Sequence, residues 1–135
     1  MIGNRIYIGE QANTKLRSLA QRTKLTPNLL CRVGFCLSVE DATPLNTSLY
    51  QDGNAREFNM PTLFGEYQEL FLALLRERRH WDSDDIDVRN DPDDAIHLRG
   101  HISRGVIQLS LQTKSIEDIL APLESTRDSR ETSIE

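Results

Sequence analysis

The chain has 135 residues, 38% of them hydrophobic and 27% charged, and a net charge of -5, which predicts a single domain with one modest core. Its strictest apolar run, Leu70–Leu75, spans six residues, where a membrane helix needs about 20, so a membrane protein is excluded. The start lacks the apolar region of a signal peptide, and two cysteines form no disulfide framework, so we expect a cytoplasmic protein.

The charge is unevenly distributed along the sequence. Residues 1–36 contain six basic residues against Glu10 alone, a net of +5, whereas residues 37–135 carry a net of -10. A basic segment on an acidic protein is a hint of nucleic-acid contact, although solvated helix faces would explain the distribution equally well. If DNA is bound, the candidate phosphate contacts are Arg5, Lys15, Arg17, Arg22, Lys24 and Arg32.

The N-terminal third has a readable pattern of elements. The alternation in Arg5–Ile8 predicts a short strand, and the apolar spacing in Glu10–Thr23 predicts a helix. Thr26 is a good N-cap for a second helix that begins at Pro27 and ends near Val39. Gly34 lies inside this second helix, where a glycine allows another helix to approach closely.

The order strand, helix, turn, helix is typical of ribbon-helix-helix DNA-binding proteins. In such a protein Ile6 and Ile8 would face a dimer core, while Arg5 and Tyr7 would face outward. The strand would pair with that of a partner chain, because an isolated ribbon is marginally stable in water. An ordinary strand–helix–helix start is the alternative.

The rest of the chain predicts a long connector over residues 40–62 and a helical remainder over residues 63–120. A helix is expected over Glu66–Trp81, with an apolar stripe formed by Tyr67, Leu70, Phe71, Leu74 and Leu75. A further helix is expected from Pro92 to about Leu111. Within it, Gly100 and Gly105 indicate either close packing or a break.

The end of the chain predicts a short helix that begins near Ser115 and ends at Pro122, then a disordered polar tail over residues 121–135. The predicted fold class is therefore mainly α, in one domain over residues 1–120. It consists of a short strand, a ribbon-helix-helix-like helix pair, two further long helices and a short C-terminal helix.

Candidate chemistry is sparse. Cys31 and Cys36 are best explained by core packing, because free cysteine behaves as a small hydrophobe. His97 and His101 have the i,i+4 spacing of a metal pair but lack the glutamate of a zinc-protease motif. The aspartates of 82–94 lack the glycine and the terminal glutamate of a calcium loop. We therefore expect no metal, no cofactor and no enzymatic activity.

Four segments, in chain order, resemble the DndE family of bacterial DNA phosphorothioation systems. Each is weak alone, but together they cover residues 5 to about 120, which makes the resemblance fairly specific. The matching segments are Leu16–Thr23 followed by Leu30–Ser38 (LCRVGFCLS), Phe64–Tyr67 followed by Leu72–Leu75 (FGEY, LALL), Leu98–Leu109 around Arg104-Gly105, and Lys114–Leu120 (KSIEDIL).

The resemblance implies an accessory subunit in the replacement of a non-bridging phosphate oxygen of DNA by sulfur. It implies contact with the duplex, preferentially nicked, and a homo-oligomer, with a tetramer favoured. The sulfur chemistry would belong to partners: a cysteine desulfurase, an iron–sulfur ATP-pyrophosphatase-like enzyme and an ATPase. A ribbon-helix-helix regulator, a protein-interaction scaffold and a metal-dependent nickase using His97 or His101 are the alternatives.

Overall fold

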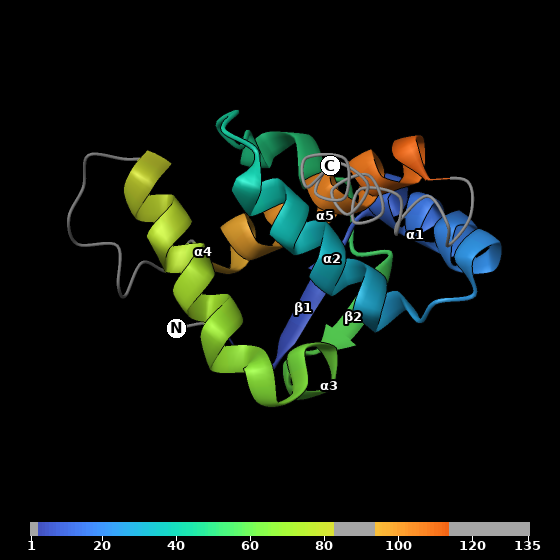
Figure 1. The fold of residues 1–135 in the computed structure, drawn as a ribbon, viewed down its shortest axis with the longest axis horizontal. Helices are drawn as coiled ribbons and strands as arrows, with labels where there is room; N and C mark the ends of the chain where they lie inside the picture. The colour runs from blue at the N-terminus through green and yellow to red at the C-terminus, as the bar shows by residue number, and fades with distance from the viewer. Residues whose placement is uncertain (1–2, 83–93, 114–135) are drawn as a thin grey trace, which may run out of the picture.

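The computed structural model describes residues 3–82 and 94–113, and over these the fold is mainly α, as the sequence predicts (Figure 1). The strands and helices follow the chain in this order: β1 (Arg5–Ile8), α1 (Glu10–Thr23), α2 (Pro27–Glu40), the 3-10 helix η1 (Thr47–Tyr50), β2 (Arg56–Asn59), α3 (Met60–Phe64), the 3-10 turn η2 (Gly65–Tyr67), α4 (Gln68–Asp82) and α5 (Asp94–Gln112). In the described residues no helix is both long and apolar enough to cross a membrane.

The first two helices follow the sequence closely. α1 has the predicted bounds and buries Ala12, Leu16 and Leu19 along one stripe. α2 begins at Pro27, and the Thr26 side chain accepts a hydrogen bond from the Leu29 N–H at 3.3 Å. This contact satisfies one of the free N–H groups of the first turn, so Thr26 is the predicted N-cap.

The predicted strand exists, but its predicted partner is wrong. β1 pairs antiparallel with β2 of the same chain, with Arg5 opposite Asn59 and Ile8 opposite Arg56. Ile6 is buried as expected, yet it faces the core of its own chain together with Phe58. A second copy is therefore not needed to pair β1, and the ribbon of a ribbon-helix-helix dimer is not formed.

The predicted connector over residues 40–62 contains η1, β2 and the start of α3. α5 holds this segment in place, because Arg99 donates to the Tyr50 carbonyl from Nε and to Asn54 Oδ1 from Nη1, both at 2.7 Å. The segment also caps α1, since Asp52 Oδ2 accepts from the Gln11 N–H at 2.9 Å. These contacts join residues far apart in the sequence, so the local composition did not predict them.

α2 and α5 cross in close contact at two glycines. A Cβ atom added to Gly105 would lie 1.6 Å from the Gly34 carbonyl oxygen, and one added to Gly34 would lie 2.8 Å from the Val106 nitrogen. α5 continues through Gly100 and Gly105 without a break. Of the two predicted alternatives, close packing is therefore correct, and both helices approach to backbone contact.

Aromatic side chains fill the core beside this crossing. Phe35 of α2 packs edge-on against Phe64 and Phe71, with ring centroids 6.4 and 5.5 Å away, and Phe64 stacks on Phe71 at 4.6 Å. α4 thus faces the core with Phe71, Leu72 and Leu75.

The apolar stripe predicted for α4 is only partly correct. Phe71 and Leu75 are buried, but Tyr67, Leu70 and Leu74 are exposed. The inward face is completed instead by Arg78 and Arg79, whose guanidinium groups find partners inside the fold. The predicted C-terminal helix, the tail and the start of the helix at Pro92 lie outside the described residues.

Candidate nucleic-acid interface

The outer face of α1 is polar and basic. The helix packs on the core through Leu16 and Leu19, which leaves Thr14, Arg17 and Gln21 exposed on the opposite side. Its single acidic residue is Glu10, in the first turn, where the helix dipole favours a negative charge. Beyond that turn the exposed surface of α1 therefore carries only positive charge.

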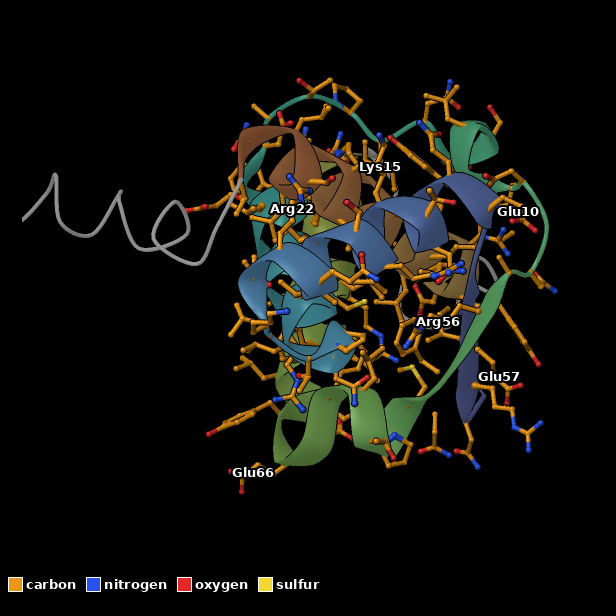
Figure 2. The ribbon with its side chains drawn as sticks, turned by 90° about the vertical axis from the view of Figure 1, so that its right-hand side faces the viewer. Glu10, Lys15, Arg22, Arg56, Glu57 and Glu66 are labelled. Atoms are coloured by element: carbon orange, nitrogen blue, oxygen red, sulfur yellow. The ribbon has the colours of Figure 1, made fainter. Side chains whose placement is uncertain are left out.

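Of the six predicted cations, three have side chains with no ion pair or hydrogen bond to the described residues, namely Lys15, Arg17 and Lys24. Lys15 is half-buried on one flank of α1, and Arg17 is exposed on its crest. Lys24 is exposed at the end of the helix, where it adopts a left-handed backbone with φ 63° and its N–H donates to the Ala20 carbonyl at 2.9 Å. Their charges are available for a ligand, and Figure 2 shows Lys15 along the edge of α1.

Arg22 lies on the same flank but already has partners. Its Nη1 donates to the Thr113 carbonyl at 2.7 Å, and its Nη2 donates to Ser110 Oγ at 3.1 Å. These contacts place a guanidinium at the C-terminal end of α5, where carbonyl groups lack intrahelical donors. Arg22 therefore fastens α1 to α5, and in Figure 2 it lies beside the end of that helix.

Arg5 and Arg32 also have partners within the chain. Arg5 Nε lies 3.0 Å from Glu57 Oε1 across the β1–β2 pair, so its charge is offset by a neighbouring carboxylate. Arg32 is half-buried, and its Nε donates to the Leu63 carbonyl at 2.6 Å, at the end of α3. The six predicted residues thus separate into three with free charges and three with intramolecular contacts.

Arg56 is a basic residue that sequence reasoning missed. It lies in β2, half-buried, with its guanidinium carbon 5.3 Å from the centroid of the Phe58 ring. β2 brings it to the side of the molecule that presents α1, as Figure 2 shows. The β1–β2 pairing places it there, opposite Ile8. Charge along the sequence did not indicate Arg56, because the segment that contains it is otherwise acidic.

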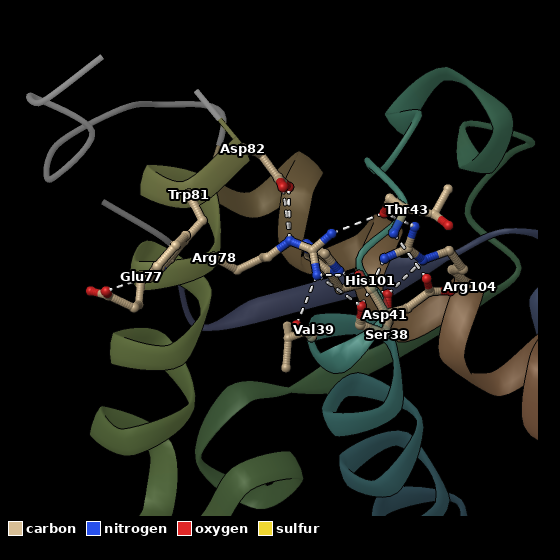
Figure 3. Close-up of polar contacts among 10 residues, drawn as sticks. All are labelled: Ser38, Val39, Asp41, Thr43, Glu77, Arg78, Trp81, Asp82, His101 and Arg104. Atoms are coloured by element: carbon tan, nitrogen blue, oxygen red, sulfur yellow. Dashed lines mark hydrogen bonds and ion pairs between the residues drawn. The ribbon is translucent and has the colours of Figure 1, made fainter. Parts of the chain in front are cut away.

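A second polar cluster lies inside the fold, around the C-terminal end of α2 (Figure 3). Ser38 Oγ lies 2.8 Å from His101 Nδ1 and accepts from Arg104 Nε, also at 2.8 Å. Arg104 can only donate, so the Ser38 hydroxyl accepts from it and keeps a proton that can bond to Nδ1, while Nε2 of His101 has no hydrogen-bond partner among the described residues. Burial lowers the pKa of His101 to about 3, with Arg104, Arg78 and His97 adding repulsion, so the ring is neutral near pH 7.

The arginines of this cluster bind carbonyl oxygens. Arg104 Nη2 donates to the Ser38 carbonyl at 2.7 Å, and Arg78 donates to the carbonyls of Val39 at 2.8 Å and Thr43 at 2.9 Å. Positive charge at the C-terminal end of a helix is favoured by its dipole. A serine beside a histidine resembles a nucleophile and its base, but both side chains are fully buried. The cluster therefore holds the end of α2 in place and gives a substrate no access.

The two cysteines have different environments. Burial raises the pKa of Cys31 to about 12, in agreement with the predicted core position. Cys36 is exposed and is not among the buried residues of α2, so its predicted core position is wrong. In the described part of the chain no three side chains of the His, Cys, Asp and Glu types gather as metal ligands.

The sequence and the fold are both similar to those of known proteins. The family model for "DNA sulphur modification protein DndE" matches residues 5–117. The crystal structure of DndE from Escherichia coli B7A, involved in DNA phosphorothioation modification, superposes with a TM-score of 0.66 at 19% identity, covering 84% of this chain and 100% of that one. A DndE G21/24K mutant structure gives 0.58 at 20% identity, covering 79% and 99%. No curated protein matches.

Proposed function

Because the chain belongs to the DndE family, which is involved in DNA phosphorothioation, we propose that it is the DNA-associating accessory subunit of the modification complex. The observation that carries this proposal is the family match together with the exposed, basic outer face of α1. The structural likeness supports the fold, and the function follows from the family.

Lys15, Arg17 and Lys24 are the primary phosphate contacts in this proposal. Each lacks an anionic partner among the described residues, so phosphate binding would cost no existing ion pair. Arg5, Arg22 and Arg32 would contribute long-range attraction, since direct phosphate contact competes with the carboxylate or carbonyls that they already bind. The six predicted residues thus have unequal roles.

The chain would position DNA while partners carry out the sulfur chemistry. We assign no catalytic residue, because the Ser38–His101 pair is enclosed. The partners proposed are the other phosphorothioation subunits, with the ATP-pyrophosphatase-like and ATPase components among them. A homo-oligomer, with a tetramer favoured, would gather several α1 faces and thereby offset the net charge of -5.

Salt titration of binding to nicked and intact duplexes of the same sequence tests this proposal. Displacement of counterions from duplex DNA makes log K fall with log salt, by about 0.9 for each phosphate neutralised. We expect a measurable negative slope on both duplexes and tighter binding to the nicked one. Absence of binding at low salt, or a slope of zero, would contradict DNA association.

A protein-interaction scaffold without DNA contact is the second candidate. The observation that favours it is the exposed apolar surface of α4, where Leu70 and Trp81 are 55% and 78% exposed. This candidate predicts stable co-purification with partner subunits and no mobility shift with either duplex. The mobility shift therefore separates the two candidates.

A further inference from the structure

The chain leaves the described part of the fold beside the basic face of α1. Thr113 is the last described residue, and its carbonyl oxygen accepts from Arg22 Nη1 at 2.7 Å. Arg22 Nη2 also donates to Ser110 Oγ at 3.1 Å, so the same guanidinium is fixed on the last turn of α5. Residues 114–135 therefore begin within one side-chain length of α1, whose edge carries both Arg22 and Lys15 in Figure 2.

The segment that begins there is acidic. Residues 114–135 contain six acidic and three basic residues, a net of -3. The acidic residues are Glu117, Asp118, Glu124, Asp128, Glu131 and Glu135. The match to the DndE family model ends at residue 117, so five of these six residues lie beyond the part of the chain that resembles the family. The charge of residues 118–135 is thus a property of this chain rather than of the matched domain.

The outer face of α1 carries the opposite charge. Lys15 lies seven residues before Arg22, which is about two helical turns, so both side chains are on the flank where residue 114 begins. Arg17 and Lys24 lie across the outer face, and its exposed Ser18 and Gln21 are uncharged. Glu10 is the single acidic residue of α1 and lies in its first turn. An acidic segment that crosses this face therefore meets cations and neutral side chains.

The segment is long enough to reach all of these cations. α1 has 14 residues and is therefore about 21 Å long. The 11 residues from Lys114 to Glu124 can span at most about 36 Å when extended. Covalent attachment also raises the effective concentration of the segment at α1, to the order of millimolar for a short tether. Weak ion pairs are consequently sufficient for a populated contact.

We propose that the acidic segment 118–135 binds the outer face of α1 and competes with DNA phosphates for Lys15, Arg17 and Lys24. Carboxylate and phosphate oxygens are both anionic acceptors, so a side chain that pairs with one is less available to the other. Exposed ion pairs are individually weak and are screened by salt. A duplex, which presents many phosphates and releases counterions on binding, can therefore displace the segment.

This competition regulates the interface given under the proposed function, and it rests on that function only for its effect on DNA affinity. The contact between the segment and α1 lies within one chain, so it is measured without DNA. Failure of the DNA proposal and failure of this one are consequently distinct results.

A nitroxide on the acidic segment tests the contact in the full chain. Ser129→Cys in a Cys36→Ser background directs the label to position 129, because Cys31 is buried. At low salt we expect the nitroxide to attenuate the amide signal of Gln21 on α1. The amide signal of Ala73 should be unaffected, because α4 lies on the opposite side of the described fold from α1 (Figure 1). The attenuation should disappear at high salt, where the ion pairs are screened.

Two results of this measurement would overturn the proposal. One is an amide signal of Gln21 that is attenuated no more than that of Ala73 at low salt. The other comes from a mixture of nitroxide-bearing chains and isotope-labelled chains without a nitroxide. Attenuation that persists in this mixture would assign the contact to a second copy of the chain.

DNA affinity tests the competition. Glu124→Gln/Asp128→Asn/Glu131→Gln removes three negative charges from the segment and leaves the described fold unchanged. We expect this variant to bind duplex DNA at least fivefold more tightly than wild type at low salt. The difference should decrease as salt is raised, because the competing ion pairs are then weaker in wild type.

The matched control removes the same charge from the far side of the molecule. Glu66→Gln/Glu69→Gln/Glu77→Gln changes three exposed residues of η2 and α4, and we expect less than a twofold gain in DNA affinity. Equal gains in the two variants would show an effect of net charge alone and would overturn the competition. Absence of DNA binding in every variant would contradict the proposed function, while attenuation at Gln21 would still support the contact with α1.

Discussion

Gly105 of α5 lies against Gly34 of α2 so closely that a Cβ atom at position 105 would sit 1.6 Å from the Gly34 carbonyl oxygen. This contact is between backbones, so no change of side-chain rotamer can make room for the added carbon. The crossing places Ser38 next to His101 and Arg104, and so determines where the buried polar cluster forms.

Gly105→Ala should therefore unfold the protein or destabilise it by more than about 3 kcal/mol, even though alanine favours a helix by about 1 kcal/mol relative to glycine. Urea unfolding measures the difference. Gly3→Ala is the matched control, since nothing lies within 4 Å of a Cβ at that exposed position. A Gly105→Ala variant as stable as wild type would show that the helices do not cross at backbone contact.

His101 should make stability depend on pH. Its pKa is near 3 in the folded protein and near 6.5 when unfolded, so between these values the unfolded chain binds the extra proton. The free energy of unfolding should therefore fall as the pH drops below about 6.5, by at most about 1.4 kcal/mol for each pH unit. Urea unfolding at pH 7 and pH 5 measures the change.

His101→Gln should flatten this dependence over the same interval, while His80→Gln, at an exposed position, should preserve it. Asp41 acts at lower pH, because hydrogen bonds from Thr43 and Gln108 lower its pKa to about 2 from 3.8. Its contribution to stability is present above about pH 3.8 and is lost as the pH falls toward 2. Identical slopes between pH 7 and 5 for wild type and His101→Gln would contradict the assignment.

Arg104→Met should destabilise the fold by about 2–5 kcal/mol. The variant removes three buried donors at once, those to the Ser38 and Thr43 carbonyls at 2.7 Å and the one to Ser38 Oγ at 2.8 Å. Arg78 still donates to the Thr43 carbonyl at 2.9 Å, so the Ser38 contacts account for most of the loss. Arg17→Met removes the same charge from an exposed position and should change stability by less than about 0.5 kcal/mol. Equal thermal midpoints for the two variants would show that Arg104 does not hold the end of α2.

Thiol labelling should distinguish the two cysteines. Native protein should react with a maleimide once, at exposed Cys36, and twice in denaturant. Cys31 is protected both by its burial and by a pKa raised to about 12, which removes the reactive thiolate at pH 7. Rapid labelling of two thiols in native protein would place Cys31 at the surface.

The local sequence pattern was sufficient to predict the features that depend on residues close together in the chain. The bounds of α1 and the Thr26 cap depend on neighbouring residues in the sequence. The close approach at Gly34 depends on a single residue type, glycine. The partner of β1 was not predictable in this way, because Phe58 is the one buried residue of β2 and no alternation marks that strand. Its place is determined by Arg99 and Asp52, through contacts across the chain.

The candidate interface shows the same limit. Charge along the sequence selected six basic residues, but it could not show that Arg22 and Arg32 donate to carbonyls at the ends of α5 and α3. The apolar spacing in α4 likewise could not separate Phe71, which enters the core, from Leu70, which remains exposed, because that helix has apolar residues on two sides. Which face meets the core is a property of the packed fold.

The most direct test of DNA association through α1 compares two variants that lose the same charge. Arg17→Ala/Lys24→Ala removes two free cations, and Thr62→Glu/Gln68→Glu lowers the net charge equally at the first turns of α3 and α4, where acidic residues are favoured. The salt slope of duplex binding should fall by about 1.8 in the first variant and stay unchanged in the second. Equal slopes for both variants and wild type would contradict the proposed interface.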